Sequence, residues 1–150
     1  MTPKTIKDAI KTRVNTELEV AQSYTIQYDN VDKATPDNAA WIRVTILPGQ
    51  SSDRSVGSPG SNVIRHMGIV VFQIFTPINT GDKDAYDIQE IIRTSFKPAT
   101  YGGVKYKAAT VTRVGEEDSW SQINVDIPYQ ADELAVSYTH LRAHETGRNL

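Results

Sequence analysis

The sequence predicts an α+β fold, in which two helices pack against one mostly antiparallel sheet in the order α-β-β-β-α-β-β. Two segments repeat apolar residues at helical spacing, and several others alternate apolar and polar residues as half-buried strands do. The chain has 150 residues, which suits one domain of ordinary size. We therefore expect a single domain over residues 1–135.

The first helix is expected at the N-terminus. Thr2 can cap it, and Pro3 suits its first position because proline has the helical φ and no N–H to satisfy. The apolar residues that follow recur at spacings of three and four, which indicates one buried stripe. These residues are Ile6, Ala9, Ile10, Val14, Leu18 and Ala21.

Two strands and a loop are expected next. Residues 24–28 alternate briefly, and residues 41–47 alternate more regularly, with Pro48-Gly49 expected to end the second strand. Residues 50–62 are rich in Gly, Ser and Pro, so we expect a mobile loop there and hypothesise that it orders on assembly. Its marker residues are Gln50, Asp53, Gly57, Gly60 and Asn62.

The strongest strand signal covers residues 63–76. Residues 69–75 are apolar on both faces, which predicts a strand that is central or covered on both sides, and Pro77 is expected to end it. A second helix should begin at Gly81-Asp82 and end at Lys97-Pro98. Its expected buried stripe is Ala85, Ile88, Ile91, Ile92 and Phe96.

A closing hairpin is predicted from the remaining chain. Residues 104–114 form its first strand, and the polar residues 115–118 form its turn. The last strand is the most regular in its alternation. Its inward side chains are expected to be Ile123, Val125, Ile127 and Tyr129.

Residues 136–150 are interpreted as a translated sequencing adaptor and not as native chain. The run from Val136 to Thr146 is what the end sequence of a transposon-based library adaptor encodes in frame. A natural polar helix is the alternative. On this interpretation, residues 136–150 are excluded from the expected fold, and native C-terminal residues are lost. The i, i+4 pair His140 and His144 is then not expected to be a metal site.

Composition excludes several classes of function. There is no cysteine, so the chain has neither disulfides nor thiolate metal sites, and this suits the cytoplasm. The net charge of −2 argues against a dedicated nucleic-acid binder. No apolar run approaches the length of a membrane span, and Met1-Thr2-Pro3-Lys4 begins no signal peptide.

No catalytic or cofactor motif is present in the sequence. The run Gly57-Ser58-Pro59-Gly60-Ser61 lacks the glycine spacing of a nucleophile elbow, and His66 is interpreted as an ordinary edge histidine rather than a base. Carboxylates at 116–118 are interpreted as a solvated turn, and the basic residues Lys105, Lys107 and Arg113 as a solvated strand face. We therefore expect no enzyme activity, cofactor or metal.

Several short motifs, in their order and spacing, resemble the tail-terminator family of long-tailed phages. The resemblance spans residues 3–133. The tail-terminator family comprises the lambda minor tail protein U type and a related family of unknown function. The motifs are Trp41-Ile42-Arg43-Val44, Arg65-His66-Met67-Gly68, Phe75-Thr76-Pro77, Gly81, Phe96 and the run from Trp120 to Pro128-Tyr129.

The resemblance implies a structural subunit that closes into a hexameric ring on the tail tube. Such a ring would stop polymerisation of the tail-tube protein and join it to head-completion proteins, with assembly in the bacterial cytoplasm and no membrane or specific nucleic acid as partner. For the interaction surface we single out Trp41, Arg43, Arg54, Arg65 and Trp120. The alternatives are a neck adaptor, a small acid-dependent hydrolase, and a module that binds peptides at a sheet edge.

Overall fold

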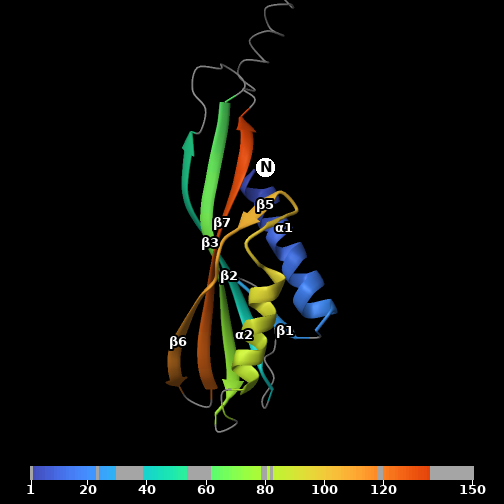
Figure 1. Cartoon of the computed structure of the whole chain (residues 1–150), viewed down its shortest axis with the longest axis vertical. Coiled ribbons are helices and arrows are strands. Elements are labelled where there is room, and N and C mark those ends of the chain that lie inside the picture. The colour runs from blue at the N-terminus through green and yellow to red at the C-terminus, as the bar shows by residue number, and fades with distance from the viewer. Residues whose placement is uncertain are drawn as a thin grey trace, which may run out of the picture.

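The computed structural model contains two helices packed on one face of a curled, seven-stranded sheet (Figure 1). It describes residues 2–22, 24–29, 39–53, 62–78, 81, 83–117 and 120–135. The interpretation of residues 136–150, and the predicted roles of Arg54, Gly57 and Gly60, lie outside these ranges. The α+β class and the predicted order of elements are confirmed.

The N-terminal helix α1 (Pro3–Val14) begins as predicted. The Thr2 hydroxyl accepts a hydrogen bond from the Thr5 amide at 3.3 Å, and Ile6, Ile10 and Val14 are buried. The helix continues as a π-helix, η1 (Asn15–Val20), which has wider turns and in which Leu18 is buried. Ala21 is exposed, so its predicted place on the stripe is wrong, because the wider turns of η1 break the 3.6-residue period.

The sheet is built around three long strands: β2 (Trp41–Asp53), β3 (Asn62–Pro77) and β7 (Trp120–Ala135). The order is β1-β2-β3-β7-β5-β4, and β6 also pairs with β7. The short strand β1 (Thr25–Tyr28) pairs with β2 in parallel, and the other pairs are antiparallel.

Three expectations about β2 and the segment after it were wrong. The strand does not end at Pro48-Gly49 but continues through a bulge to Asp53, where it still pairs with β3. Gln50 and Asp53 therefore lie in β2, and Asn62 begins β3, so none of the three belongs to a loop. Proline is tolerated at 48 because β1 covers only residues 41–44, which leaves β2 an edge strand beyond them.

Helix α2 (Lys83–Ser95) follows β3 and packs beside α1 on the same face. Arg13 connects α1 to the end of α2: its guanidinium donates two hydrogen bonds to the Ser95 carbonyl, at 2.7 and 3.2 Å. The same group lies 3.7 Å from the Tyr101 ring centroid and pairs with Glu17 at 3.2 Å. One side chain therefore connects α1 to η1, to the end of α2 and to Tyr101.

The predicted strand over 104–114 is divided. It forms β5 (Val104–Tyr106) and β6 (Thr110–Glu117), which pair with successive parts of β7, and a short β4 (Thr100–Tyr101) precedes them. Gly115 and Glu117 extend β6 instead of forming its turn, because Gly115, at φ +120°, accommodates a bulge in the ladder.

The core lies between the helices and the covered face of the sheet. The strands contribute alternate residues in register: Val44 opposite Phe72, and Phe72 opposite Val125. The predicted inward residues of β7 and the α2 residues Ala85, Ile88, Ile92 and Phe96 are buried. The core aromatic rings are in contact, with Phe96 centred 5.2 Å from Phe72 and 5.0 Å from Tyr106.

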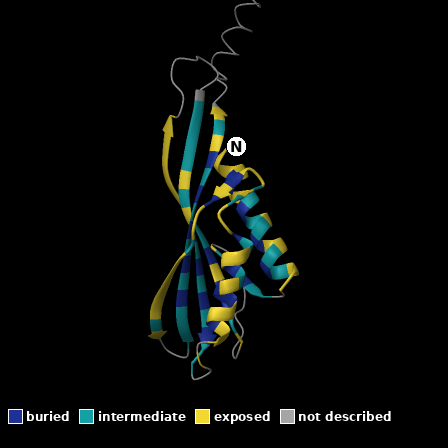
Figure 2. Cartoon of the chain, viewed as in Figure 1, coloured by how far each residue is buried: buried dark blue, intermediate teal, exposed yellow. Residues whose placement is uncertain are grey.

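The helices cover only one face, so β3 is central but not covered on both sides. Its inward residues Val70, Phe72 and Ile74 are buried, whereas Ile69 on the opposite face is 40% exposed. Beyond the helices, β2, β3 and β7 continue as a three-stranded arm, residues 48–53, 62–68 and 129–135 (Figure 2). Among the residues that the structure describes, no helix or further strand covers the other face of the sheet.

Candidate interaction surface

An aromatic cluster lies on the uncovered face of the sheet, which we call the open face. Trp41 is opposite Phe75 in the ladder, and their rings are stacked with centroids 4.3 Å apart and planes 14° apart. Trp120 meets Trp41 edge-on, at 6.2 Å and 89°. These contacts leave Trp41 only 7% exposed. The two tryptophans therefore pack on each other on this face of the sheet.

Arg43 joins this cluster from the next outward position of β2. Its guanidinium carbon lies 5.6 Å from the centroid of the Trp41 ring, and it donates two hydrogen bonds to the Gln27 amide oxygen, at 3.1 and 3.3 Å. The structure thus brings together three of the five residues singled out from sequence. Phe75 was missed, although it shares the outward parity of Ile69 in the apolar run.

Arg65 lies on the same face but on the arm, far along β3 from the cluster. It makes a two-pronged ion pair with Asp132, with N–O distances of 2.8 and 3.1 Å. Hydrogen bonding to this carboxylate raises the pKa of Arg65. Because its guanidinium is already engaged, Arg65 holds β3 to β7 and does not extend the aromatic cluster.

Between these two places the β2 and β3 strands carry exposed apolar side chains on the open face, beside polar residues such as Gln73, Asn124 and Asp126. Leu47 and Ile69 are direct cross-strand partners and are 50% and 40% exposed, and the neighbouring Met67 is 41% exposed. Contiguous exposed apolar side chains of this kind mark surfaces that contact other proteins. The open face is therefore a candidate interface in its own right.

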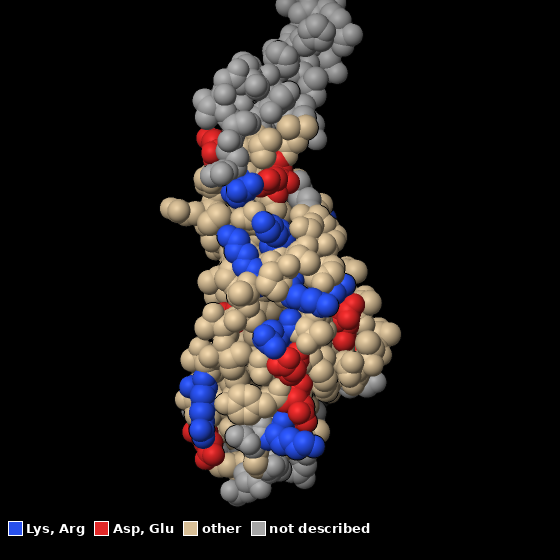
Figure 3. Space-filling view, in the orientation of Figure 1, with Lys and Arg blue, Asp and Glu red and all other residues tan. Residues whose placement is uncertain are grey.

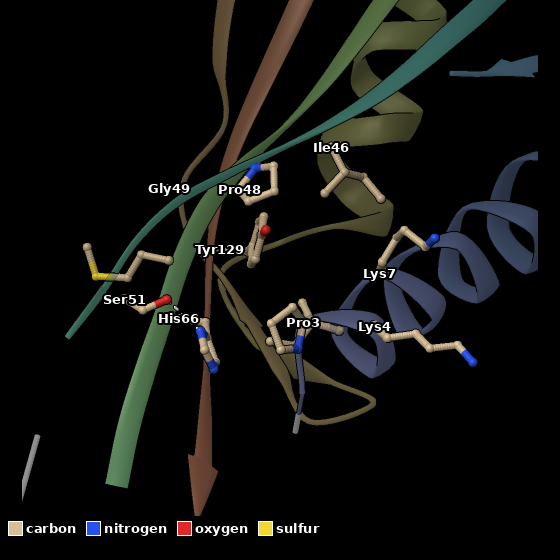
Figure 4. A pocket seen from close by; sticks show the side chains of 11 residues that line it. Pro3, Lys4, Lys7, Ile46, Pro48, Gly49, Ser51, His66 and Tyr129 are labelled. Atoms are coloured by element: carbon tan, nitrogen blue, oxygen red, sulfur yellow. Dashed lines mark hydrogen bonds between the residues drawn. The ribbon is translucent and has the colours of Figure 1, made fainter. Parts of the chain in front are cut away.

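A cavity of about 330 Å³ opens on the other face, between the start of α1 and the base of the arm (Figure 4). Its wall is mainly apolar and is formed by Pro3, Ile6, Ile46, Pro48 and Tyr129. Ser51 and His66 lie at one end, and Lys4 and Lys7 extend from α1 at the rim. We call it the α1 pocket. Burial raises the pKa of Tyr129.

The three polar side chains at the base of the arm connect neighbouring strands. The Ser51 hydroxyl lies 2.6 Å from His66 Nδ1, and a Glu133 carboxylate oxygen lies 3.5 Å from His66 Nε2. In a catalytic triad the acid orients Nδ1 and the serine faces Nε2. The arrangement here is the reverse, and it links β2, β3 and β7 where no helix covers them.

The remaining sequence candidates form no further site. Lys105 and Lys107 are exposed on and beside β5, whereas Arg113 is exposed on β6, and acidic and basic side chains are interspersed on the visible face (Figure 3). Within the described ranges no group of three or more His, Asp or Glu side chains could hold a metal ion. No described helix is long and apolar enough to cross a membrane.

A sheet with helices on one face and exposed apolar side chains on the other is typical of a subunit that contacts other proteins. The family model for phage tail terminator protein matches residues 5–129, and the chain belongs to that family. Its members are structural proteins of the phage tail. No curated protein matches the chain.

The fold is also found among solved structures. One of them is 14% identical to this chain and superposes with a TM-score of 0.67, covering 87% of this chain and 96% of its own. At this level of identity the similarity shows the fold alone. It extends over almost the whole of that protein.

Proposed function

We propose that this chain is the subunit that caps the phage tail tube, stops its polymerisation and joins it to the head-completion proteins as a homohexameric ring. The observation that carries the proposal is the family match over residues 5–129, which includes both helices and most of the sheet. Assembly would take place in the cytoplasm of the bacterial host. The protein would act by binding, without catalysis.

Three surfaces of the chain support this role. A ring subunit must contact two neighbours through different surfaces and still leave surfaces for the tube and the neck. The open face, the α1 pocket and the free edge of β6 are separate surfaces, and each has exposed apolar residues. Leu47 on the open face and Val114 on β6 are 50% and 53% exposed. A protein with no partner would gain nothing from this exposure.

The proposal is tested with the tail-tube protein of the same phage. Tube protein is polymerised with and without this chain, and tube lengths are measured by electron microscopy. We expect added chain to shorten the tubes and to appear as a ring at one end. Tubes of unchanged length, with no density at their ends, would contradict the capping role.

A phage that lacks the gene separates a terminator from a neck adaptor. Loss of a terminator should produce overlong tails, because nothing stops tube growth. Loss of a neck adaptor should produce tails of normal length beside unattached heads. The second result would assign the chain to the neck, with the same fold and family.

A further inference from the structure

The open face carries one positive and one negative side chain on its central part. We define the central patch as the outward residues of three neighbouring strands, within 41–47 of β2, 69–75 of β3 and 122–128 of β7. Its charged residues are Arg43 and Asp126. Arg43 is exposed and bonds only the neutral Gln27 amide, and neither charge has an ion pair within the described part of the chain.

The two charges lie on opposite sides of the central patch. Arg43 shares a cross-strand row with Asn124, and Asp126 shares the next outward row, toward the arm, with Thr45. They are therefore two strands and one row apart, which is roughly 12 Å at ordinary strand spacing. The nearby carboxylate of Asp29 accepts a hydrogen bond from the Thr45 hydroxyl at 3.1 Å. The patch thus presents a cation and an anion at fixed, separate positions.

We propose that the free chain forms a two-fold dimer through the central patch, in which Arg43 of each copy faces Asp126 of the other. A two-fold contact repeats each pairing twice, so a surface with one cation and one anion complements itself. The exposed side chains of Leu47 and Ile69 are removed from water as the two sheets pack. The occupant of the open face is therefore a second copy of this chain.

The positions of the two charges fix how the sheets cross. A two-fold axis that exchanges Arg43 and Asp126 runs at roughly 35° to the strands. The strands of the two copies then cross at roughly 70°, close to the orthogonal class of sheet packing. The same axis passes within about 2 Å of the position of Leu47. Leu47 of one copy therefore meets Leu47 of the other.

The area of this contact predicts a weak dimer. With β1 and β6 on its two sides, the patch is roughly 24 Å across in each direction, or about 600 Å² for each subunit. Stable complexes bury about 800 Å² on each partner. We therefore expect a dissociation constant of about 10 μM or higher, which corresponds to about −7 kcal/mol or weaker.

This dimer goes beyond the proposed function. A contact with two-fold symmetry is not the contact between neighbours in a cyclic ring, which joins two different surfaces. The dimer covers the open face while the chain is free, and dissociation exposes that face again for assembly. Self-association and assembly on the tube therefore compete for one surface.

Charge exchange tests the pairing directly. Arg43→Glu and Asp126→Arg are made separately in the full chain, and self-association is measured by sedimentation equilibrium. Each change places like charges in contact twice in the dimer, so each should raise the dissociation constant about tenfold or more. Lys97→Glu and Asp84→Arg are matched controls on exposed side chains at the two ends of α2, and they should have little effect. A native dissociation constant in both patch variants would overturn the contact.

A mixture of the two variants distinguishes a specific pairing from a general effect of charge. The Arg43→Glu copy retains Asp126, and the Asp126→Arg copy retains Arg43, so both pairs are again of opposite charge in the mixed dimer. Mixing should therefore restore association to within about threefold of the native chain, although neither variant associates alone. No recovery, with both variants folded by circular dichroism, would overturn the pairing.

Cross-linking at the axis tests the orientation of the two sheets. The chain has no cysteine, so Leu47→Cys introduces a single thiol. Sheets packed face to face lie about 10 Å apart, so a short bismaleimide is used instead of a disulfide. Leu47→Cys should give covalent dimers faster than Thr94→Cys on the exposed side of α2, and adding Asp126→Arg should slow it. Equal rates at the two cysteines would overturn the orientation.

The tube-length assay is independent of these measurements. If the chain sediments as a monomer at all concentrations but shortens tubes, the dimer is wrong and the capping role stands. If the charge variants behave as expected but tube length is unchanged, the dimer stands and the capping role is wrong. Each proposal can therefore be rejected without the other.

Discussion

Gly68 is the position at which the smallest change should have the largest effect on stability. It lies in β3 beneath the ring of Tyr129, which also lines the α1 pocket. A Cβ at Gly68 would be 2.5 Å from the Tyr129 hydroxyl oxygen, 2.6 Å from the adjoining ring carbon and 2.6 Å from the Leu47 carbonyl oxygen. The first two contacts press on a buried ring, and the third on the β2 backbone, so no rotation relieves all of them.

Gly68→Ala should therefore destabilise the fold, although alanine is otherwise better than glycine in a strand by about 0.5–1 kcal/mol. Overpacking a well-packed site costs about 1–3 kcal/mol. With a urea dependence of about 2 kcal/mol per molar, a net loss of about 2 kcal/mol lowers the unfolding midpoint by about 1 M. Circular dichroism in a urea titration measures this shift.

A second variant tests whether the ring is the cause. Tyr129→Leu removes the two ring contacts and keeps an apolar side chain, so Gly68→Ala should cost less in that background than in the native one. A variant Gly68→Ala that is as stable as the native chain would refute the reasoning. Equal cost in both backgrounds would assign the strain to the Leu47 carbonyl alone.

Four further predictions concern the fold. Trp41→Ala should cost about 3–5 kcal/mol and abolish the near-ultraviolet dichroism of the aromatic cluster, because Trp41 is buried; a loss below about 1 kcal/mol would contradict this. Burial raises the pKa of Tyr106 from 10.0 to about 12, so the unfolded chain releases this proton first and stability should fall as pH rises between these values; thermal melts should show Tyr106→Phe to be less affected. Arg13→Lys should recover only part of the loss caused by Arg13→Ala in urea titrations, since an ammonium cannot combine stacking with a forked hydrogen bond. A chain ending at Ala135 should match the full chain in melting temperature, and a clear decrease would contradict the adaptor interpretation of residues 136–150.

Local patterns were enough for the framework of this fold. The parity of Val44 and Val125 was visible in the alternation of their strands, and the structure places both on the covered face. The Thr2 cap was equally local. Pro48 was misinterpreted because its effect depends on whether another strand lies beside β2, which depends on the short extent of β1. The residues around Pro48 do not show which strand lies beside β2 or how far it extends.

The candidate surfaces were less accessible to sequence reasoning. Trp41, Arg43 and Trp120 could be singled out because tryptophan and arginine are common in interfaces, but their proximity depends on the register between β2, β3 and β7. The α1 pocket combines residues from Pro3 to Tyr129, so it exists only in the folded chain.

Strands β3 and β7 remain paired over all sixteen residues of each, from Asn62 opposite Ala135 to Pro77 opposite Trp120. A strand of this length spans roughly 50 Å. Because this ladder has no bulge, the arm and the aromatic cluster lie in one continuous register along the same two strands. A subunit of this shape can fix the distance and angle between two partners that bind at its two ends.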